Sequence, residues 1–323
     1  GAAQSRARVA GRRAAATAEV IQAGRSGVLP VDKGAGLTSF QVVAHLRRVL
    51  RAPKIGHGGT LDPAATGLLP ILVGEATKLT PYLVDLDKEY VATVRLGVTT
   101  DTQDLSGAVL ETRPVPGLGA ADVERKLLAF VGSVSQVPPM YSALHHEGRR
   151  LYELAREGVE VERRPREVTV HSIALESLAL PDFTIRVRCG KGFYVRTLAA
   201  DLGAALGPGG ALATLVRTRV GPYRLEDAVT WETVREARDG GALWPRLLPP
   251  DSALAVMQEA RLSSGDARAF VNGQSVTDPG APGPVRVYGP DGAFLGIGAR
   301  RGELVKPERL LHADPPRPRV LPA

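Results

Sequence analysis

The stretch Gly56-His57-Gly58-Gly59-Thr60-Leu61-Asp62-Pro63-Ala64-Ala65-Thr66-Gly67 places one carboxylate in a loop with few available backbone conformations. Glycine permits turns that a side chain would block, and Pro63 disfavours helical geometry at the residue before it. Asp62 is therefore presented to its surroundings instead of lying on a helix face. An Asp-Pro pair alone is a common turn signal. The neighbouring sequence decides whether Asp62 is a nucleophile.

Composition sets broad limits on the class of protein. The chain has 323 residues, enough for one large core and a smaller domain, and 41 Lys+Arg against 34 Asp+Glu give a net charge of +7. This balance favours a polyanionic partner. Cys189 is the single cysteine, so no internal disulfide can form, and no Cys/His spacing typical of metal ligands is present. No apolar run approaches the ~20 residues of a membrane span. These features predict a cytoplasmic protein without a metal.

Periodic patterns predict the elements around the Asp62 loop. A hydroxyl cap at Thr38 or Ser39 precedes apolar residues at helical spacing that continue to Leu50. The remaining positions of this region are basic: Arg47, Arg48, Arg51 and Lys54. After the loop, 68–73 is a short apolar run typical of a buried strand, and 76–83 has a helical pattern.

Alternating patterns predict two further strands, one beginning at Tyr90 and reaching Leu96, the other covering 183–189. A helix is predicted from Thr197 to about Leu206. Strands and helices mix without a strict βαβ repeat, which indicates an α/β or α+β sheet domain rather than a doubly wound one.

The two ends of the chain differ from its middle. Residues 1–26 are rich in Ala and Arg and predict a basic, disordered arm, and the Pro/Arg-rich tail 315–323 is also expected to be disordered. From 251 to 314, short strands separated by Gly and Pro predict a small β-rich domain, in which 285–288 and 293–297 form a hairpin. Interleaved charges between 138 and 167 are typical of a solvated loop and helix.

Several blocks of this sequence together resemble the TruB family of bacterial tRNA pseudouridine-55 synthases. The resemblance covers about Gly27 to about His312, with one departure at Gly34, where the family usually has proline. The blocks that carry it are Val31–Ser39, His57–Gly67, Gly74–Lys78, Asp87–Tyr90, Cys189–Thr197 and Leu215–Thr218.

The resemblance implies a fold and a function. The fold would be the pseudouridine-synthase mixed sheet with flanking helices over 27–250, an insertion at 138–167 that closes over RNA, and a PUA-type RNA-binding domain at 251–314. The expected activity is isomerisation of the T-loop uridine of tRNA to pseudouridine, by a monomer that needs no cofactor. The T-stem-loop of tRNA would be the partner.

The resemblance also assigns residues to the reaction. Asp62 would be the nucleophile, paired with Arg196, whose guanidinium would keep the carboxylate ionised and oriented. Tyr90 would offer an aromatic plane and a phenol able to relay the C5 proton of an everted uracil. Tyr194 precedes Arg196 by two positions, so on an extended segment both would point the same way. The expected substrate contacts are His57, Tyr194 and Leu215 for the base and its surroundings, and Lys33, Lys78, Lys88, Lys191, Arg217 and Arg219 as basic contacts.

Two other functions stay open from the residues. The chain could be an RNA-binding or RNA-folding protein in which base extrusion matters without chemistry. It could also be an N-glycosylase attacking C1′, which would normally need a second carboxylate to activate water. The Asp62 block contains none, and only Asp85, Asp87, Asp101 and Asp104 keep this alternative open.

Overall fold

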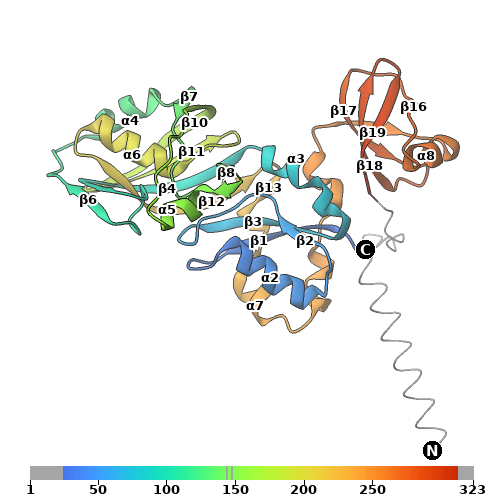
Figure 1. The fold of residues 1–323 in the computed structure, drawn as a ribbon, viewed down its shortest axis with the longest axis horizontal. Coiled ribbons are helices and arrows are strands. Elements are labelled where there is room, and N and C mark those ends of the chain that lie inside the picture. Colours follow the sequence, from blue (N-terminus) through green and yellow to red (C-terminus); the bar gives the residue numbers. More distant parts are fainter. Residues whose placement is uncertain (1–24, 143–144, 147, 312–323) are drawn as a thin grey trace, which may run out of the picture.

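The computed structural model describes residues 25–142, 145–146 and 148–311. The predicted arm 1–26 lies outside the described residues except for Arg25 and Ser26, and the predicted tail 315–323 lies wholly outside them. Figure 1 shows a larger body built on a long twisted sheet and a smaller body formed by the C-terminal strands.

A mixed sheet organises the larger body. Its main path runs β14-β1-β3-β12-β4-β11-β10-β7, with β2 paired to β3 and β13 to β12. The pairs β1–β14 and β3–β12 are parallel, whereas β4 is antiparallel to both β12 and β11. The expected sheet without a βαβ repeat is thus confirmed. The strands are β1 Gly27–Lys33, β2 Ile55–His57, β3 Thr66–Val73, β4 Lys88–Leu96, β7 Gly132–Gln136, β10 Arg166–Ala179, β11 Asp182–Cys189, β12 Gly210–Val220, β13 Tyr223–Arg224 and β14 Val229–Thr230.

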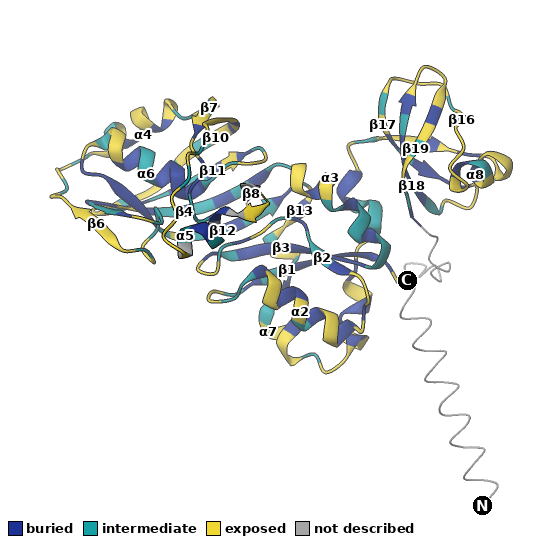
Figure 2. Cartoon of the chain, in the orientation of Figure 1, coloured by how far each residue is buried: buried dark blue, intermediate teal, exposed yellow. Residues whose placement is uncertain are grey.

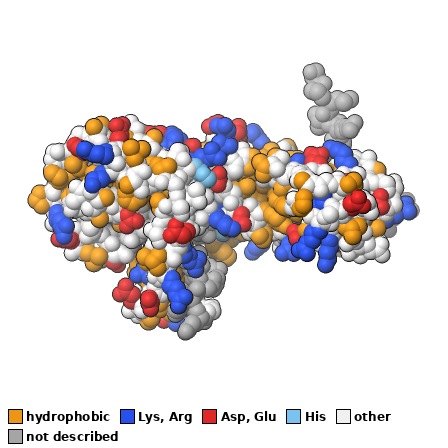
Figure 3. Space-filling view, turned by 90° about the horizontal axis from the view of Figure 1, so that it is seen from above, with side chains coloured by type: hydrophobic (Ala, Val, Ile, Leu, Met, Phe, Trp, Pro, Cys, Tyr) orange, Lys and Arg blue, Asp and Glu red, His pale blue; other side chains and the backbone are white. Residues whose placement is uncertain are grey.

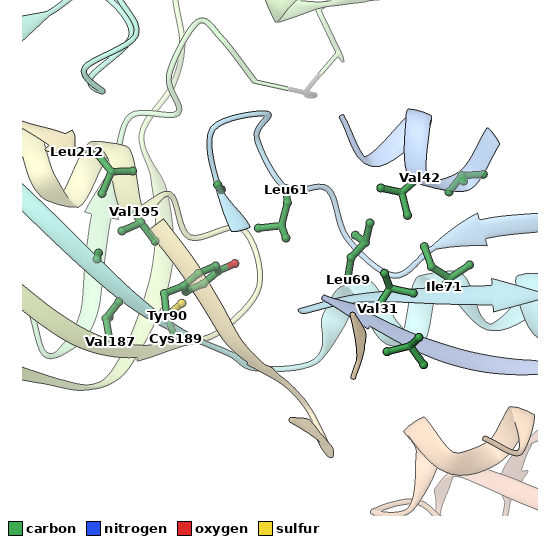
Figure 4. Packing of buried hydrophobic residues seen from close by; sticks show 14 of the residues in the cluster. Val31, Val42, Leu61, Leu69, Ile71, Tyr90, Val187, Cys189, Val195 and Leu212 are labelled. Atoms are coloured by element: carbon green, nitrogen blue, oxygen red, sulfur yellow. The ribbon is translucent and has the colours of Figure 1, made fainter. Parts of the chain in front are cut away.

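Helices cover the inner face of this sheet. Apolar side chains of α2, α4 and α6 join those of β3, β4 and β11 in one core, part of which is drawn in Figure 4. The helices are α2 Ser39–Leu50, α3 Thr80–Asp85, α4 Ala120–Leu128, α5 Leu151–Arg156, α6 Val195–Leu206, α7 Trp231–Glu236 and α8 Ser264–Val271. The 3-10 helices are η1 Gly74–Leu79, η2 Leu225–Asp227, η3 Gly240–Ala242, η4 Trp244–Arg246 and η5 Pro250–Leu254. Two small hairpins pair β5 Val98–Thr100 with β6 Val109–Thr112, and β8 His145–His146 with β9 Arg149–Arg150.

A second core joins the two bodies. Leu68 and Leu72, on the other face of β3, share one buried cluster with residues of η1, α3 and η5, and with Ile297 and Leu311 of the smaller body. Lys78 Nζ donates to the carbonyl of Leu310 (2.8 Å) across the same contact. The C-terminal sheet has the order β15-β17-β18-β19-β16. Its strands are β15 Gln258–Arg261, β16 Val276–Thr277, β17 Gly283–Tyr288, β18 Phe294–Arg301 and β19 Leu304–Leu310, and β17 and β18 form the predicted hairpin.

Local sequence accounts for α2 and for a break after η1. Thr38 caps α2 through a reciprocal capping box with Gln41, as the hydroxyl signal predicts. The single helix predicted over 76–83 is wrong, because the segment divides into η1 and α3. Pro81 lies in the first turn of α3, where its missing N–H costs no helical hydrogen bond.

The strand and helix starts near the site also differ from expectation. β4 begins at Lys88, two residues before Tyr90, although the predicted inward face of Tyr90, Ala92, Val94 and Leu96 is confirmed by their burial. Helix α6 begins at Val195 and not at Thr197. Arg196 therefore lies in the first turn of α6 and Tyr194 is its extended N-cap, so the premise that both share an extended segment is wrong.

Replacing Gly67 by alanine is expected to destabilise the sheet. Gly67 has φ of +97°, and an added Cβ would lie 2.4 Å from the carbonyl oxygen of Arg217 on β12. Because both backbone strain and this clash must be relieved, Gly67→Ala should lower the free energy of unfolding by ~2 kcal/mol or more, measured by urea denaturation. Gly56→Ala is the control, since nothing lies within 4 Å of its added Cβ. Equal free energies of unfolding for the two variants would contradict the requirement for glycine at position 67.

Candidate active site

The Asp62 loop is anchored on both sides of an accessible carboxylate. Leu61 and Ala65 are buried in the main core, whereas the side chain of Asp62 is 41% exposed. The amide of Ala65 donates to the carbonyl of Asp62 (3.1 Å) and closes the turn at Pro63. The predicted presentation of Asp62 away from any helix face is confirmed, since it lies in the loop between β2 and β3.

The segment leading into α2 holds the loop from one side. Ser39 Oγ donates to the carbonyl of Leu61 (3.1 Å) and accepts from its amide (2.9 Å). The amide of Gly36 donates to the carbonyl of Pro63 (2.8 Å). Lys33 is fully buried, and its ammonium donates to the carbonyls of Pro63 (3.3 Å), Leu37 (2.8 Å) and Gly34 (3.0 Å).

Arg217 on β12 holds the loop from the opposite side. Its side chain is buried, and its guanidinium donates to the carbonyls of Leu68 (2.7 Å), Thr60 (3.2 Å) and Gly59 (3.1 Å). The sequence suggested Lys33 and Arg217 as substrate contacts. Both lie in the interior with their donors directed at backbone carbonyls, and this geometry supports a role in positioning the loop.

Arg196 brings the first turn of α6 to the nucleophile candidate. Its Nε lies 2.9 Å from Oδ2 of Asp62, and its own side chain is only 6% exposed. The other two nitrogens donate to the carbonyls of Thr102 (3.2 Å) and Tyr141 (2.7 Å). The guanidinium plane is thus fixed by three separate segments, and the pair that the sequence suggested is present in the structure.

Asp104 is a second carboxylate at this guanidinium, which sequence analysis noted only for the glycosylase alternative. Its Oδ2 lies 4.0 Å from Nε of Arg196. Its Oδ1 accepts from the Ser106 amide (2.9 Å) and from the hydroxyls of Ser106 (2.5 Å) and Thr102 (2.8 Å). The Asp-x-Ser spacing is a signal for such a turn, but nothing local in sequence links it to Arg196.

Tyr90 faces the loop from the centre of the sheet. It is buried on β4, and in Figure 4 its phenol oxygen points toward the loop that carries Leu61. Burial, more than any neighbouring charge, raises the pKa of this phenol, so its neutral form is favoured and its hydroxyl can donate a hydrogen bond. Leu215 and Arg217 on β12 lie opposite Ala92 and Tyr90 on β4, which puts them on the same sheet face.

Tyr194 and His57 are the other residues predicted to contact the base or its surroundings. Tyr194 is half-buried, and burial raises the pKa of its phenol. Gln136 pairs with the backbone of Tyr194 through both its amide nitrogen (3.2 Å) and its amide oxygen (3.0 Å), which fixes the start of α6. His57 ends β2 at the entry to the loop and is half-buried.

The other predicted phosphate contacts fall into two groups. Lys191 has an exposed side chain (63%) paired with Asp85, and Lys78 is partly exposed beside Glu75. Lys88 is buried, donates to the carbonyls of Val84 (2.5 Å) and Leu86 (2.6 Å), and burial lowers its pKa to about 8. Arg219 is half-buried and donates to the carbonyl of Gly221 (2.8 Å). Contact with RNA stays a prediction for these residues.

Two broad features of the described residues bear on other kinds of function. They contain no group of three or more His, Cys, Asp or Glu side chains placed to share a metal ion. None of their helices has the length and apolar character needed to cross a bilayer.

The buried ammonium of Lys33 predicts a pH-dependent stability. Burial lowers its pKa from 10.5 to about 8, so between these values the unfolded chain holds a proton that the folded chain has released. The free energy of unfolding should therefore rise with pH across this window, by up to about 1.4 kcal/mol per unit. The difference between wild type and Lys33→Met should grow from pH 7.5 to pH 9.5 in urea denaturation.

Lys191→Met is the control, because this side chain is exposed. Its difference from wild type should be the same at the two pH values. A Lys33→Met difference that also does not change with pH would rule out the buried, deprotonating lysine.

Comparison with known proteins gives consistent matches along most of the chain. Three family models match: "TruB family pseudouridylate synthase (N terminal domain)" at 47–195, "tRNA pseudouridylate synthase B C-terminal domain" at 196–255, and "Pseudouridine synthase II TruB, C-terminal" at 259–311. The tRNA pseudouridine synthase B of Aromatoleum aromaticum is 47% identical over 287 residues, covering 88% of this chain and 92% of that protein. The protein of the same name from Chromohalobacter salexigens is 46% identical, covering 88% and 94%.

Solved structures show the same fold at lower identity. A chain of a Cbf5–Nop10–Gar1 complex superposes with a TM-score of 0.68 at 24% identity, covering 92% of this chain and 86% of that one. A chain of an archaeal box H/ACA sRNP Nop10–Cbf5 complex gives 0.67 at 24% identity, covering 91% and 88%. The mixed sheet and the C-terminal β-rich body are therefore a known combination.

Proposed function

Because the chain belongs to the TruB family of pseudouridylate synthases, we propose that it isomerises the uridine at position 55, in the T-loop of tRNA, with Asp62 as the nucleophile. Pseudouridine synthases are isomerases, and relatives at about 46% identity are named for tRNA. The observation that carries the residue assignment is the 2.9 Å pair between an accessible Asp62 and a buried Arg196.

The reaction is an isomerisation that conserves every atom of the nucleoside. The bond from ribose C1′ to uracil N1 breaks, a bond from C1′ to C5 forms, and the C5 proton leaves while N1 gains one. A carboxylate suits the covalent step because it is both a nucleophile and a tolerable leaving group. Attack by Asp62 at C6 or at C1′ is compatible with this balance.

Arg196 holds the carboxylate of the nucleophile in a fixed orientation as RNA excludes water from the site. A buried guanidinium with two backbone acceptors cannot turn away, so its Nε stays directed at Asp62. Asp104, at 4.0 Å, adds a second negative charge that offsets the cost of burying the cation. We expect the orientation of Arg196, and through it that of Asp62, to depend on Asp104.

The target base must leave its stack to reach this site. Extrusion followed by capture between apolar and aromatic groups is the general solution for enzymes that act on a base. Tyr90, Tyr194 and Leu215 provide such groups, and we assign Tyr90 to the relay of the C5 proton because its phenol faces the loop that carries Asp62. His57, at the loop entry, is assigned to RNA binding.

Other segments are proposed to hold the RNA around the base. The insertion at 138–167 contributes the Tyr141 carbonyl to Arg196, which places its start beside the site. We assign it to closure over the RNA, and we assign the C-terminal body, residues 251–314, to RNA binding as a PUA-type domain. The enzyme is proposed to act as a monomer on the T-stem-loop, with Lys78 and Lys191 near phosphates.

The two alternatives are less well supported. A glycosylase would need a carboxylate free to activate water, whereas Asp104 Oδ1 already accepts three hydrogen bonds and Oδ2 is directed to Arg196. An RNA-folding protein needs no nucleophile with an oriented cation. RNA folding is better considered an additional activity of the same surface.

Asp62→Asn should abolish turnover without abolishing binding. With tRNA carrying tritium at C5 of uridine, wild type should release tritium without free uracil, and Asp62→Asn should fall by at least about a thousandfold because the amide is a poor nucleophile. Its Kd for tRNA should change by less than about threefold, since a single exposed group is altered.

Asp182→Asn is a matched control, since this aspartate pairs with Arg95 on an exposed edge. Free uracil as the product would indicate the glycosylase, and neither product would indicate a binding protein. Tritium release by Asp62→Asn at the wild-type rate would remove Asp62 from the mechanism.

A further inference from the structure

The outer face of α2 combines one exposed aromatic side chain with several arginines. Phe40 is 71% exposed, and Ala44, Arg47, Arg48 and Arg51 are exposed as well. Spacings of four, seven, eight and eleven residues from Phe40 put all five on one side of the helix. We name these five residues the α2 ridge, and Figure 2 shows α2 with an exposed side opposite its buried one.

The ridge carries positive charge without acidic neighbours on its own helix. Ser39–Leu50 contains no Asp or Glu, and Arg51 is the C-cap. Arg47 donates to the Ile55 carbonyl (3.3 Å) and Arg48 lies 3.3 Å from His45 Nδ1, and neither of these contacts neutralises an arginine charge. On the face of the larger body shown in Figure 3, by contrast, acidic and basic side chains are interspersed.

The N-terminal end of the ridge is tied directly to the catalytic loop. Ser39, adjacent to Phe40, makes two hydrogen bonds with the backbone of Leu61, which precedes Asp62. From there the ridge extends about 16 Å along α2, given the 1.5 Å rise per residue. An RNA whose target uridine lies at Asp62 has flanking nucleotides within reach of a surface that begins at this loop.

We propose that the α2 ridge is an RNA-binding surface for the nucleotides that flank the target uridine, with the arginines contacting phosphates and Phe40 stacking on a base. The proposal rests on the function proposed above, because the RNA is positioned by its uridine at Asp62. Arginine meets phosphate irrespective of sequence, and an exposed aromatic ring stacks on any base.

A protein partner fits this surface less well than RNA does. The ridge exposes one large apolar side chain, whereas protein interfaces have several packed at their centre. Its arginines form a line along one helix, which suits a string of phosphates. The neighbouring α7 exposes Glu232, Arg235 and Glu236, two acids and one base, so the positive charge of this region comes from α2.

The test uses the full chain and unmodified tRNA with tritium at C5 of uridine. A triple variant, Arg47→Gln, Arg48→Gln and Arg51→Gln, should raise Kd by about tenfold or more near 0.1 M salt and leave kcat at saturating tRNA unchanged. The slope of log Kd against log salt should become shallower by about two to three, because fewer counterions are released. Phe40→Ala should raise Kd about fivefold or more without changing the slope, and Phe40→Trp should restore binding.

The matched control removes the same charge elsewhere, with Arg113, Arg125 and Lys126 replaced by Gln. All three are exposed and lie outside the ridge. An equal loss in the control, or wild-type Kd and slope in both ridge variants, would overturn the ridge as a binding surface. Tritium release by the wild type is measured separately. Its absence would contradict the proposed function, whereas unchanged Kd values of the ridge variants would contradict only the ridge.

Discussion

The whole arrangement depends on keeping a positive charge buried and correctly aimed at an accessible carboxylate. Burying an unpaired cation is costly, and the cost is offset only when each donor has an acceptor. Arg196 meets this condition with Asp62, two backbone carbonyls and the nearby Asp104. Since those acceptors come from the Asp62 loop, the segment around Thr102 and the start of the insertion, one side chain determines how three distant parts of the chain meet.

Buried cations also determine the backbone of the loop itself. Lys33 and Arg217 approach from opposite sides and donate to backbone carbonyls of the loop and of the segments beside it. Carbonyl dipoles that would be poorly satisfied in a short, glycine-rich loop thereby gain strong charge-assisted partners. We expect these hydrogen bonds to restrain the backbone of the loop, even though its sequence is conformationally permissive.

Sequence predicts best where structure depends on near neighbours. The cap of α2 follows from Thr38 and Gln41, and the inward face of β4 follows from simple alternation. The mixed sheet and the β-rich C-terminal body could likewise be predicted from local patterns in the sequence. The Arg196–Asp62 pair came from resemblance to a family, since periodicity gives no information on contacts between a loop and a distant helix.

The roles of Lys33, Arg217 and Asp104 and the start of α6 could not be predicted, because they depend on contacts between residues distant in sequence. In the sequence, Lys33 and Arg217 look the same as basic residues that contact phosphates. Only the folded positions of the backbone carbonyls at 59–68 show that both side chains donate hydrogen bonds within the protein. Asp104 joins Arg196 through a fold contact with no local signature. Helix α6 begins two residues before its predicted start, and the backbone of Tyr194, its N-cap, is held by Gln136 on the distant strand β7.

The apolar contact between the two bodies has a consequence for how the chain melts. Ile297 and Leu311 share one buried apolar cluster with Leu68, Leu72 and other residues of the larger body, so unfolding of either body would remove part of this common core. Domains joined only by a linker lose structure in separate steps, whereas a shared interior couples them. We therefore expect thermal denaturation of this protein to be a single cooperative transition in which both sheets are lost together.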